Sequence, residues 1–467
     1  MQNNKPKELI YFPSLSSFSP YLRKDIPLIN DYSHRFYDKD KFGDWHHPYF
    51  LLSAGSVYKK KTIRKDLGMD EAGDVTRPNK KDKTNCLVFG DSGGYQIATG
   101  ALKWDVKLRE DIFNWLEDNS DVAMNIDVPP VSKDYPFKEC IRITVDNMKW
   151  FEDNQTGKTD FLNVIQCQTI AQMEEWFAAV KGFKKFKGWG AGNVSCTMNF
   201  IHLLYMFKKH DMFATTDFNW FHFLGKTSPE HYMLYAVLQK KLNEHYPHIQ
   251  VTTDSSTPAM QAVFGNWYHG VNYRSKTFAG LYFGNKGKTN YIPGTPLPCT
   301  IDCPMCKEIT FTNVENDGGK ARFYIAYHNL FLMNKALKDI NVLSESHFEI
   351  FDGLVDGKFY KVLKSIIDIF DAKNNKELEK IYADIKPLLE EKQFSLGYDV
   401  SDQNVVDDSE MFGHVTIQDE EAVADRANAS LKYKLSKKDE KMVKDIKAGI
   451  AVYPYDEQYY GIEENEN

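Results

Sequence analysis

An alternation of short apolar runs with longer segments of helical spacing is the feature that most constrains this fold. Eight apolar runs between Tyr49 and Gly284 are typical of buried strands, and most are separated by a segment with helical periodicity. This pattern predicts an α/β fold of the (β/α)8 TIM barrel type. An open doubly wound sheet would alternate similarly, but no Gly-x-Gly-x-x-Gly motif follows the first strand to support dinucleotide binding. The predicted strands are residues 49–57, 86–89, 121–126, 161–165, 187–192, 220–224, 249–253 and 280–284.

The predicted barrel occupies residues 46–295 of a chain of 467 residues. Residues 1–45 lack long periodicity and predict an irregular or strand-containing lead-in. A zinc-binding subdomain is expected at 296–335, and a mainly helical extension at 336–467, ending in an acidic tail of disordered composition. The helices expected in this extension are 360–370, 376–391 and 437–446, and the tail is 457–467.

Polar or small residues stand where six of the predicted strands end. In a (β/α)8 barrel the carboxyl ends of the strands meet on one face, and that face carries the functional site. The position of these residues also fits a structural role, because an acidic or amide side chain after a strand can cap the next helix. These residues are Asp91, Asp127, Gln166, Gly192, Gly225 and Asp254.

The segment Cys86–Gln96, with the sequence CLVFGDSGGYQ, presents the first of these carboxylates. Its apolar start predicts a short strand, and the two glycines after Asp91 and Ser92 allow the backbone to approach a flat ligand. Tyr95 and Gln96 follow as candidate stacking and hydrogen-bonding groups. Taken alone, the segment also fits a structural turn with a capping Asp91 and with Tyr95 in the core.

Three of the seven cysteines are bunched and predict a metal site. Cys299, Cys303 and Cys306 have the spacing Cys-x3-Cys-x2-Cys, and His328 follows as a candidate fourth ligand. Three thiolates and one imidazole complete the tetrahedral shell of Zn²⁺ without a water, so we expect a structural zinc. The alternative is three unligated cysteines in a loop. The other cysteines are expected to be small core residues: Cys86, Cys140, Cys167 and Cys196.

Composition limits the class of protein. The chain is 42% hydrophobic and 26% charged, as in soluble globular proteins, and its formal net charge is -7. A nucleic-acid partner would therefore meet a local basic surface. Residues 59–83 and 181–187 are candidates, the latter interleaved with aromatic residues, although a solvated face explains such segments at least as well. No apolar run of about 18 residues and no leader is visible, so we expect a cytoplasmic protein without a membrane span.

Several of these motifs together resemble the tRNA-guanine transglycosylase superfamily. The barrel of that family carries an Asp-Ser-Gly-Gly-Phe/Tyr-Gln motif, a strand ending in Asp before a Pro-containing turn, a later strand ending in a nucleophilic Asp, and a zinc site of three cysteines and one histidine. Order and spacing agree from about Tyr49 to Lys335. The matching segments are DSGGYQ at 91–96, NIDVP at 125–129, TDSS at 253–256, the bunched cysteines, and YHNL at 327–330.

The chain also departs from the family pattern. Tyr95 stands where the family usually has Phe, Cys-x3-Cys replaces Cys-x-Cys, and Ala191-Gly192 replaces a glycine pair. The chain does not stop soon after the zinc site, and residues 336–467 show no clear PUA domain. These departures favour a resemblance to the DNA-modifying branch of the superfamily, which inserts 7-deazaguanine bases into DNA, over the housekeeping tRNA enzymes.

The resemblance implies a role for each candidate residue. Asp254 would attack C1′ of the nucleotide to form a covalent glycosyl-enzyme, and Asp91 would act as general acid and base on the two bases. Asp127 would accept hydrogen bonds from the N1–H and 2-amino edge of the base, while Gln166 and the Gly192 amide would contact O6. The other base-binding residues expected from the family pattern are Ser92, Tyr95 as a stacking group, and Gly225.

The sequence also bears on the incoming base and on the polymer. Residues 192–196 contain no carboxylate to hold the amine of an aminomethyl base, so we expect the uncharged nitrile preQ0. The expected polymer is DNA, with tRNA as the alternative, and a homodimer is one possible assembly. Two other functions explain the sequence less well. One is a non-catalytic zinc barrel that binds nucleic acid for a partner enzyme, which would not need all three carboxylates. The other is a barrel glycosidase, which would leave the cysteine cluster unexplained.

Overall fold

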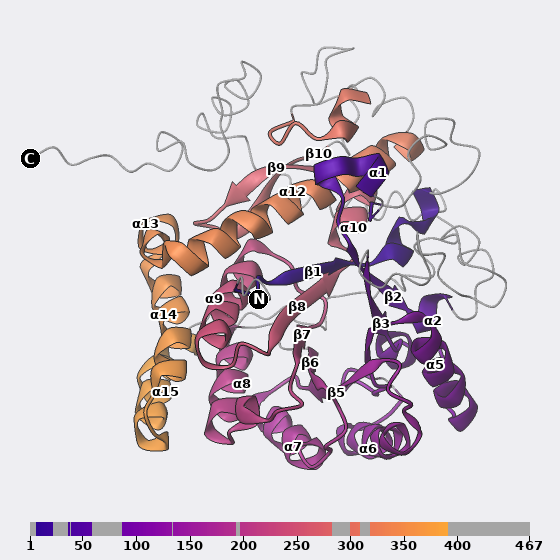
Figure 1. Ribbon diagram of the computed structural model, residues 1–467, viewed down its shortest axis with the longest axis vertical. Helices are drawn as coiled ribbons and strands as arrows, with labels where there is room; N and C mark the ends of the chain where they lie inside the picture. Colours follow the sequence, from indigo (N-terminus) through magenta and orange to yellow (C-terminus); the bar gives the residue numbers. More distant parts are fainter. Residues whose placement is uncertain are drawn as a thin grey trace, which may run out of the picture.

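The computed structural model describes residues 6–21, 36–37, 39–57, 86–132, 134–192, 197–282, 299–308 and 318–390. A parallel sheet rolled into a nearly closed barrel lies at its centre, helices surround the barrel, and further helices from the C-terminal part lie along one side (Figure 1). Several predicted features fall outside the described residues: the basic segment 59–83, Cys196, the helix at 437–446 and the acidic tail.

Eight parallel strands form the barrel in the order β1-β8-β7-β6-β5-β4-β3-β2. The ring closes where β1 lies beside β2 and Ser14 forms an isolated parallel bridge with Leu51. This confirms the predicted α/β fold with a TIM-like barrel. The strands are β1 Ile10–Pro13, β2 Tyr49–Ser53, β3 Leu87–Asp91, β4 Val122–Met124, β5 Asp160–Gln166, β6 Gly188–Gly192, β7 Trp220–Phe223 and β8 Gln250–Ser255.

The prediction of a last barrel strand at 280–284 is wrong. In the structure β10 (Thr277–Tyr282) pairs antiparallel with β9 (Asn266–Asn272) in a separate two-stranded sheet. The eighth barrel strand is β1, from the segment expected to lead into the barrel, and its Tyr11 lies opposite Thr253 of β8. The described helices between β1 and β2 have at most seven residues, so the alternation that reveals the other strands is missing there.

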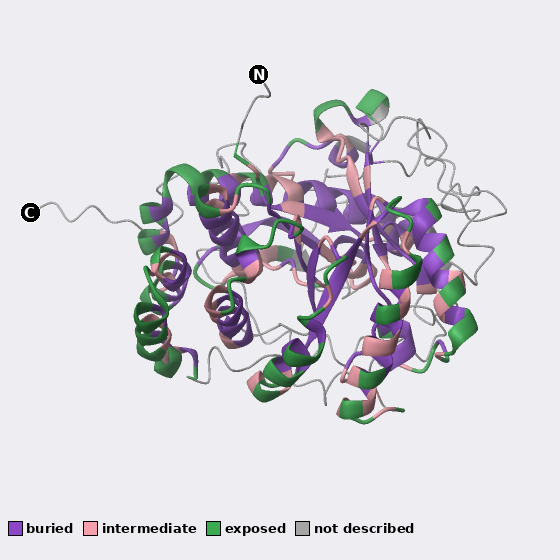
Figure 2. Ribbon diagram, turned by 60° about the horizontal axis from the view of Figure 1, so that its bottom comes forward, coloured by how far each residue is buried: buried purple, intermediate pink, exposed green. Residues whose placement is uncertain are grey.

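Helices cover the outside of the barrel and bury their apolar faces against it, while their exposed faces look outward (Figure 2). Capping side chains explain where they begin: the Asp105 carboxylate accepts from Leu108 N, and the Ser228 hydroxyl accepts from His231 N just ahead of Pro229. The helices are α2 Ala54–Val57, α4 Gly94–Ala98, α5 Val106–Asn119, α6 Phe137–Asn154, α7 Ile170–Val180, α8 Thr197–Lys209, η4 Met212–Ala214, α9 Pro229–His245 and α10 Thr257–Val263.

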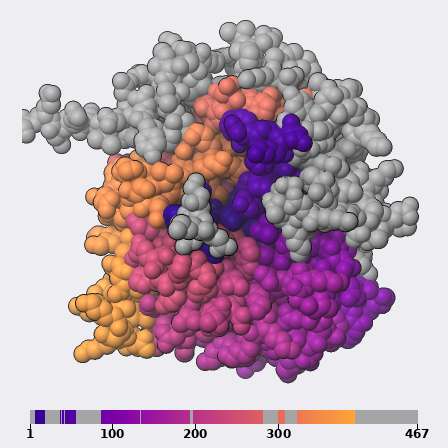
Figure 3. Space-filling view, in the orientation of Figure 1, coloured from indigo at the N-terminus to yellow at the C-terminus, as the bar shows by residue number. Residues whose placement is uncertain are grey.

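The C-terminal extension is helical as predicted in its described part, up to residue 390, and this part packs onto one side of the barrel. The long helix α12 packs on α9, α10 and β9, while α14 and α15 lie against α9 and α8 (Figure 3). Helix α14 buries one apolar face, which includes Phe359, Val362 and Ile366. The predicted helices 360–370 and 376–391 correspond to α14 and α15. The elements of this part are η5 Pro304–Glu308, α12 Gly318–Ser346, η6 Phe348–Ile350, α13 Phe351–Leu354, α14 Gly357–Asp371 and α15 Asn375–Leu389.

Candidate active site

A cavity of about 350 Å³ opens at the carboxyl ends of the barrel strands. Most of the predicted catalytic and base-binding residues line it, although they come from six different strands or strand ends. Parallel strands bring their carboxyl ends to one face, which is why residues so distant in the sequence meet here. The predicted residues that line the cavity are Asp91, Tyr95, Asp127, Gln166, Gly192, Gly225 and Asp254.

Ser92 and Tyr95 lie differently although both belong to the DSGGYQ motif. Tyr95 lines the cavity and is 43% exposed, so it is a candidate stacking group and not a core residue. Ser92 is 1% exposed and is not among the residues that line the cavity. The structure therefore does not bring Ser92 to the other predicted base-binding residues.

Helix capping does not explain the three carboxylates. Helix α4 has Gly93 at its N-cap and α10 has Ser256, and neither cap residue makes a side-chain capping bond. Asp254 lies within β8, and Asp127 precedes α6 by several residues. All three carboxylates line the cavity, and none of them is the N-cap residue of α4, α6 or α10.

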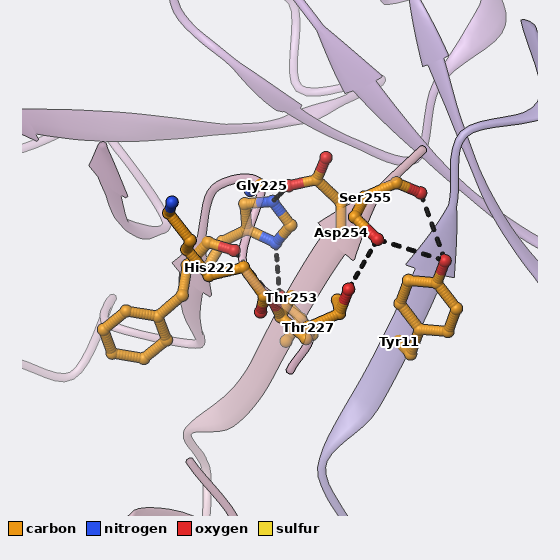
Figure 4. Close-up of polar contacts among 10 residues, drawn as sticks. Tyr11, His222, Gly225, Thr227, Thr253, Asp254 and Ser255 are labelled. Atoms are coloured by element: carbon orange, nitrogen blue, oxygen red, sulfur yellow. Dashed lines mark hydrogen bonds and ion pairs between the residues drawn. The ribbon is translucent and has the colours of Figure 1, made fainter. Parts of the chain in front are cut away.

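One oxygen of Asp254 is held by two groups (Figure 4). Oδ1 accepts the backbone N–H of Gly225 at 2.9 Å and lies 3.1 Å from Nε2 of His222. Among the described residues, Oδ2 has no hydrogen-bond partner, and the side chain is 13% exposed toward the cavity. Gly225 has φ +72, a conformation that glycine adopts without strain and that turns its N–H to this carboxylate.

His222 is a site residue that the sequence analysis missed. It is fully buried on β7, where Phe221 and Phe223 on either side face outward, and its ring stacks on Phe89 with centroids 3.9 Å apart. The register of β7 and β8 pairs His222 with Thr252, and Asp254 stands two residues further on the same face. The signal was a histidine at the inward position of an apolar strand, adjacent to a strand that ends in Asp.

The other two carboxylates are hard to ionise. Burial in the cavity raises the pKa of Asp91, and the negative charge of Asp254 adds to this, while the nearby Ser53 hydroxyl and the Gly93 amide oppose it. Burial raises the pKa of Asp127 to about 7, against a hydrogen bond from Gln166 Nε2 to Asp127 Oδ2 of 2.8 Å. Asp127 can therefore exchange a proton near neutral pH, and Asp91 keeps its proton to a higher pH than an ordinary carboxyl, as a general acid or a proton-sensitive binding group requires.

Glycines allow the close packing of this wall. A Cβ on Gly192 would lie 2.3 Å from the amide nitrogen of Gln166, so the side chain of Gln166 lies flat on the backbone of β6. A Cβ on Gly94 would lie 2.8 Å from Oδ1 of Asp127. Because Gly94 and Gly192 have no side chain, Asp127 and Gln166 can pack directly against the backbone of the cavity wall.

The charge of the cavity restricts what can bind. Among the described residues, its lining includes three carboxylates and no Lys, Arg or His. An anionic group bound next to them would be repelled, so the cavity suits a neutral or cationic ligand with N–H donors. Hydroxyl groups from the ends of β1, β2 and β8 line the other side of the ring: Ser14, Ser16, Ser53, Ser255, Ser256 and Thr257.

The predicted metal ligands come together away from this cavity. The ligand atoms of Cys299, Cys303, Cys306 and His328 all lie within 4.8 Å of one another. His328 Nδ1 lies 3.1 Å from Sγ of Cys306, 3.4 Å from Sγ of Cys303 and 3.9 Å from Sγ of Cys299. Zinc with four tetrahedral ligands needs edges of about 3.5–3.8 Å, so the cluster has the size that such an ion requires.

The surroundings of His328 also suit a metal ligand. Its Nε2 lies 2.6 Å from the carbonyl oxygen of Tyr268, which can only accept, so the proton is on Nε2 and the lone pair of Nδ1 faces the sulfurs. The ring of Trp267 stacks on the imidazole with centroids 3.7 Å apart. Since Cys303, Cys306 and His328 are also buried, this cluster could hold a metal ion such as zinc.

The second basic segment lies at the wrong end of the barrel for the cavity. Residues 181–187 precede β6, so they lie near the amino ends of the strands. Lys187 forms an ion pair with Asp217 at 2.8 Å, and Phe186 and Trp189 are buried. The idea that this segment contacts a polymer bound at the cavity is therefore not supported.

The fold and the site together define a TIM-like barrel protein with an acidic cavity at its strand ends and a separate cysteine–histidine cluster. No protein-family model matches the chain, and no curated protein is significantly similar in sequence. None of the described helices is long and apolar enough to cross a membrane.

Proposed function

We propose that the protein is a transglycosylase that exchanges guanine in DNA for the 7-deazaguanine base preQ0 through a covalent Asp254–glycosyl intermediate. One observation carries the proposal: Asp91, Asp127 and Asp254, predicted from three separate motifs, line a single cavity together with Gln166 and Gly192. An exchange of bases on one sugar needs a nucleophile, a proton donor and a base-binding carboxylate around the same nucleotide.

Base recognition is assigned to the wall formed by β4, β5 and β6. An ionised Asp127 can accept the N1–H and 2-amino hydrogens of guanine, because Gln166 holds its other oxygen from behind. Gln166 carries a second amide hydrogen, and this type of donor suits O6 of the purine. Tyr95 at the cavity mouth can stack on the base once the nucleotide is flipped out of its polymer.

The first displacement uses Asp254 and Asp91. The free oxygen Oδ2 of Asp254 attacks C1′, the C1′–N9 bond breaks, and the departing guanine takes a proton from Asp91. The raised pKa of Asp91 favours the protonated form that this step needs. Hydroxyl side chains on the β1–β2–β8 side of the cavity supply hydrogen bonds of the kind that a sugar takes.

The second displacement reverses these events with a new base. The incoming 7-deazaguanine gives its ring N–H proton to Asp91 and attacks C1′ through that nitrogen, while the C1′–Oδ2 bond breaks and its electron pair returns to Asp254. The described lining of the cavity has three acidic side chains and no cationic one, so a neutral base is accepted without a change in charge.

The cysteine cluster takes no part in these steps. Cys299, Cys303, Cys306 and His328 would hold the zinc ion, which would tie η5 to α12 as a structural cross-link.

The test is to incubate the protein with labelled preQ0 and either duplex DNA or tRNA. We expect label in DNA, no label with Asp254→Asn, and a denaturation-resistant protein–DNA adduct when the incoming base is withheld. Label in tRNA alone would replace DNA by tRNA as the substrate. Binding of either polymer without label or adduct would instead indicate a non-catalytic nucleic-acid-binding barrel.

A further inference from the structure

His222 lies directly behind the proposed nucleophile and is fixed on three sides. Its Nε2 is 3.1 Å from Oδ1 of Asp254, its Nδ1 is 2.7 Å from Oγ1 of Thr252, and its ring stacks on Phe89 at an interplanar angle of 19°. The ring is fully buried, so it does not reach the cavity itself. Of the three carboxylates that line the cavity, Asp254 is the one that His222 contacts.

The hydrogen-bond directions follow from the partners. A carboxylate oxygen only accepts, so Nε2 carries a proton and donates it to Asp254 Oδ1. Thr252 can then donate its hydroxyl hydrogen to Nδ1, which fixes the tautomer in the way that a supporting partner fixes a histidine beside a metal or a catalytic group. The stacked Phe89 stands on β3, two residues before Asp91, so the same strand supports His222 and presents the proposed general acid.

We propose that His222 is a positioning residue that holds Asp254 with Oδ2 directed to the sugar and stabilises it as the leaving carboxylate of the second displacement. This inference rests on the proposed function. With Oδ1 bound by both His222 and Gly225, Oδ2 is the oxygen that bonds to C1′. In the glycosyl ester Oδ1 becomes the carbonyl oxygen, and the two N–H groups stay on the atom that regains negative charge when the C1′–Oδ2 bond breaks.

The test separates a positioning role from a purely structural one with two substitutions. His222→Phe keeps a ring that can stack on Phe89 but removes the donor, whereas His222→Gln keeps a side-chain N–H. We expect His222→Phe to slow adduct formation and adduct breakdown by about 10- to 100-fold, the usual effect of losing one hydrogen bond to a charged group. We expect His222→Gln to restore most of this rate, and neither substitution to change the dissociation constant of the free base.

A control uses a partly buried histidine outside the cavity. His47→Gln alters an imidazole that contacts the carbonyl oxygen of Tyr11 at 2.8 Å and lies two residues before β2, so it should leave the adduct rates unchanged. Adduct rates that are equal in wild type and His222→Phe would overturn the proposal. So would a His222→Gln protein that is folded and as slow as His222→Phe.

A measurement without turnover keeps the inference separate from the proposed activity. Nitrogen NMR of the imidazole in the wild-type protein should show His222 protonated at Nε2, with a resonance that moves in Asp254→Asn. A His222 signal insensitive to that substitution would overturn the contact. A wild-type protein that shows the contact but forms no adduct with DNA or tRNA would count against the proposed function instead, and with it the catalytic use of His222.

Discussion

Asp91 and Asp254 face one cavity from strands β3 and β8, and the negative charge of Asp254 adds to burial in raising the pKa of Asp91. The two strands are separated in the barrel by β1 and β2, so this coupling exists only because the ring closes. A carboxyl that keeps its proton through burial and a neighbouring negative charge is suited to act as a proton donor, which leaves the role of nucleophile to Asp254.

Removing either carboxylate should separate these tasks. Asp254→Asn should abolish the covalent adduct, because an amide does not attack C1′. Asp91→Asn should slow exchange by about 10²- to 10⁴-fold, the usual contribution of a positioned general acid, while Asp254 remains in place. Adduct yield and exchange rate with labelled base measure both effects, and an Asp254→Asn protein that still forms adduct would contradict the assignment.

The stability of the protein should depend on pH through Asp127. The pKa of this carboxyl is about 7 when folded, above the ordinary value of 3.8, so the folded state binds the proton more tightly than the unfolded state. The stabilisation that Asp127 gives the folded state is therefore fully present below about pH 4 and is lost as pH rises through about 7.

Asp127→Asn should remove this dependence. Each pKa unit corresponds to about 1.4 kcal/mol, so the free energy of unfolding of the variant should exceed that of wild type by a few kcal/mol at pH 8 and not at pH 4. Denaturant unfolding at several pH values measures this. If the free energy of unfolding depended on pH in the same way for both proteins, Asp127 would titrate normally. The affinity for the base should rise with pH where stability falls. It should increase for wild type as pH rises through 7 and remain low for the variant.

Metal removal should destabilise the region around α12. Metal analysis of the purified protein is expected to find one equivalent of zinc, and a strong chelator or Cys303→Ser should lower the thermal midpoint, because the binding energy of a structural ion is also folding energy. Cys140→Ser is the matched control, since Cys140 is equally buried but lies outside the cluster. Equal midpoints with and without metal would exclude a structural ion.

Gly192→Ala should damage base binding. The added methyl would lie 2.3 Å from the Gln166 amide nitrogen, so Gln166 must move and release Asp127. We expect overpacking to cost about 1–3 kcal/mol of stability, and affinity for the base to fall by more than stability alone explains. Gly182→Ala has no atom within 4 Å of its new Cβ and serves as the control. Calorimetric titration with guanine and preQ0 measures the difference, and unchanged affinity would remove Gln166 from the site.

Local signals in the sequence determined a large part of this protein. The apolar alternation predicted seven of the eight barrel strands, because strand propensity acts within a few residues. Cysteine spacing predicted a cluster that the fold assembles. Carboxylates after strand ends predicted the cavity wall, because parallel strands always bring those ends together.

Tertiary structure decided what depends on contacts between distant segments. β1 became the eighth strand because its short apolar run pairs with β8 and closes the ring, and nothing within the run distinguishes it from a lead-in. The register of β7 with β8 places His222 beside Asp254. Ser92 does not contribute to the predicted base-binding site, because its side chain is buried and does not line the cavity. Residues 181–187 are basic in any reading of the sequence, but only the direction of β6 puts them at the end of the barrel away from the cavity. Chain neighbours set local conformation, whereas the closure and register of the barrel set which side chains meet.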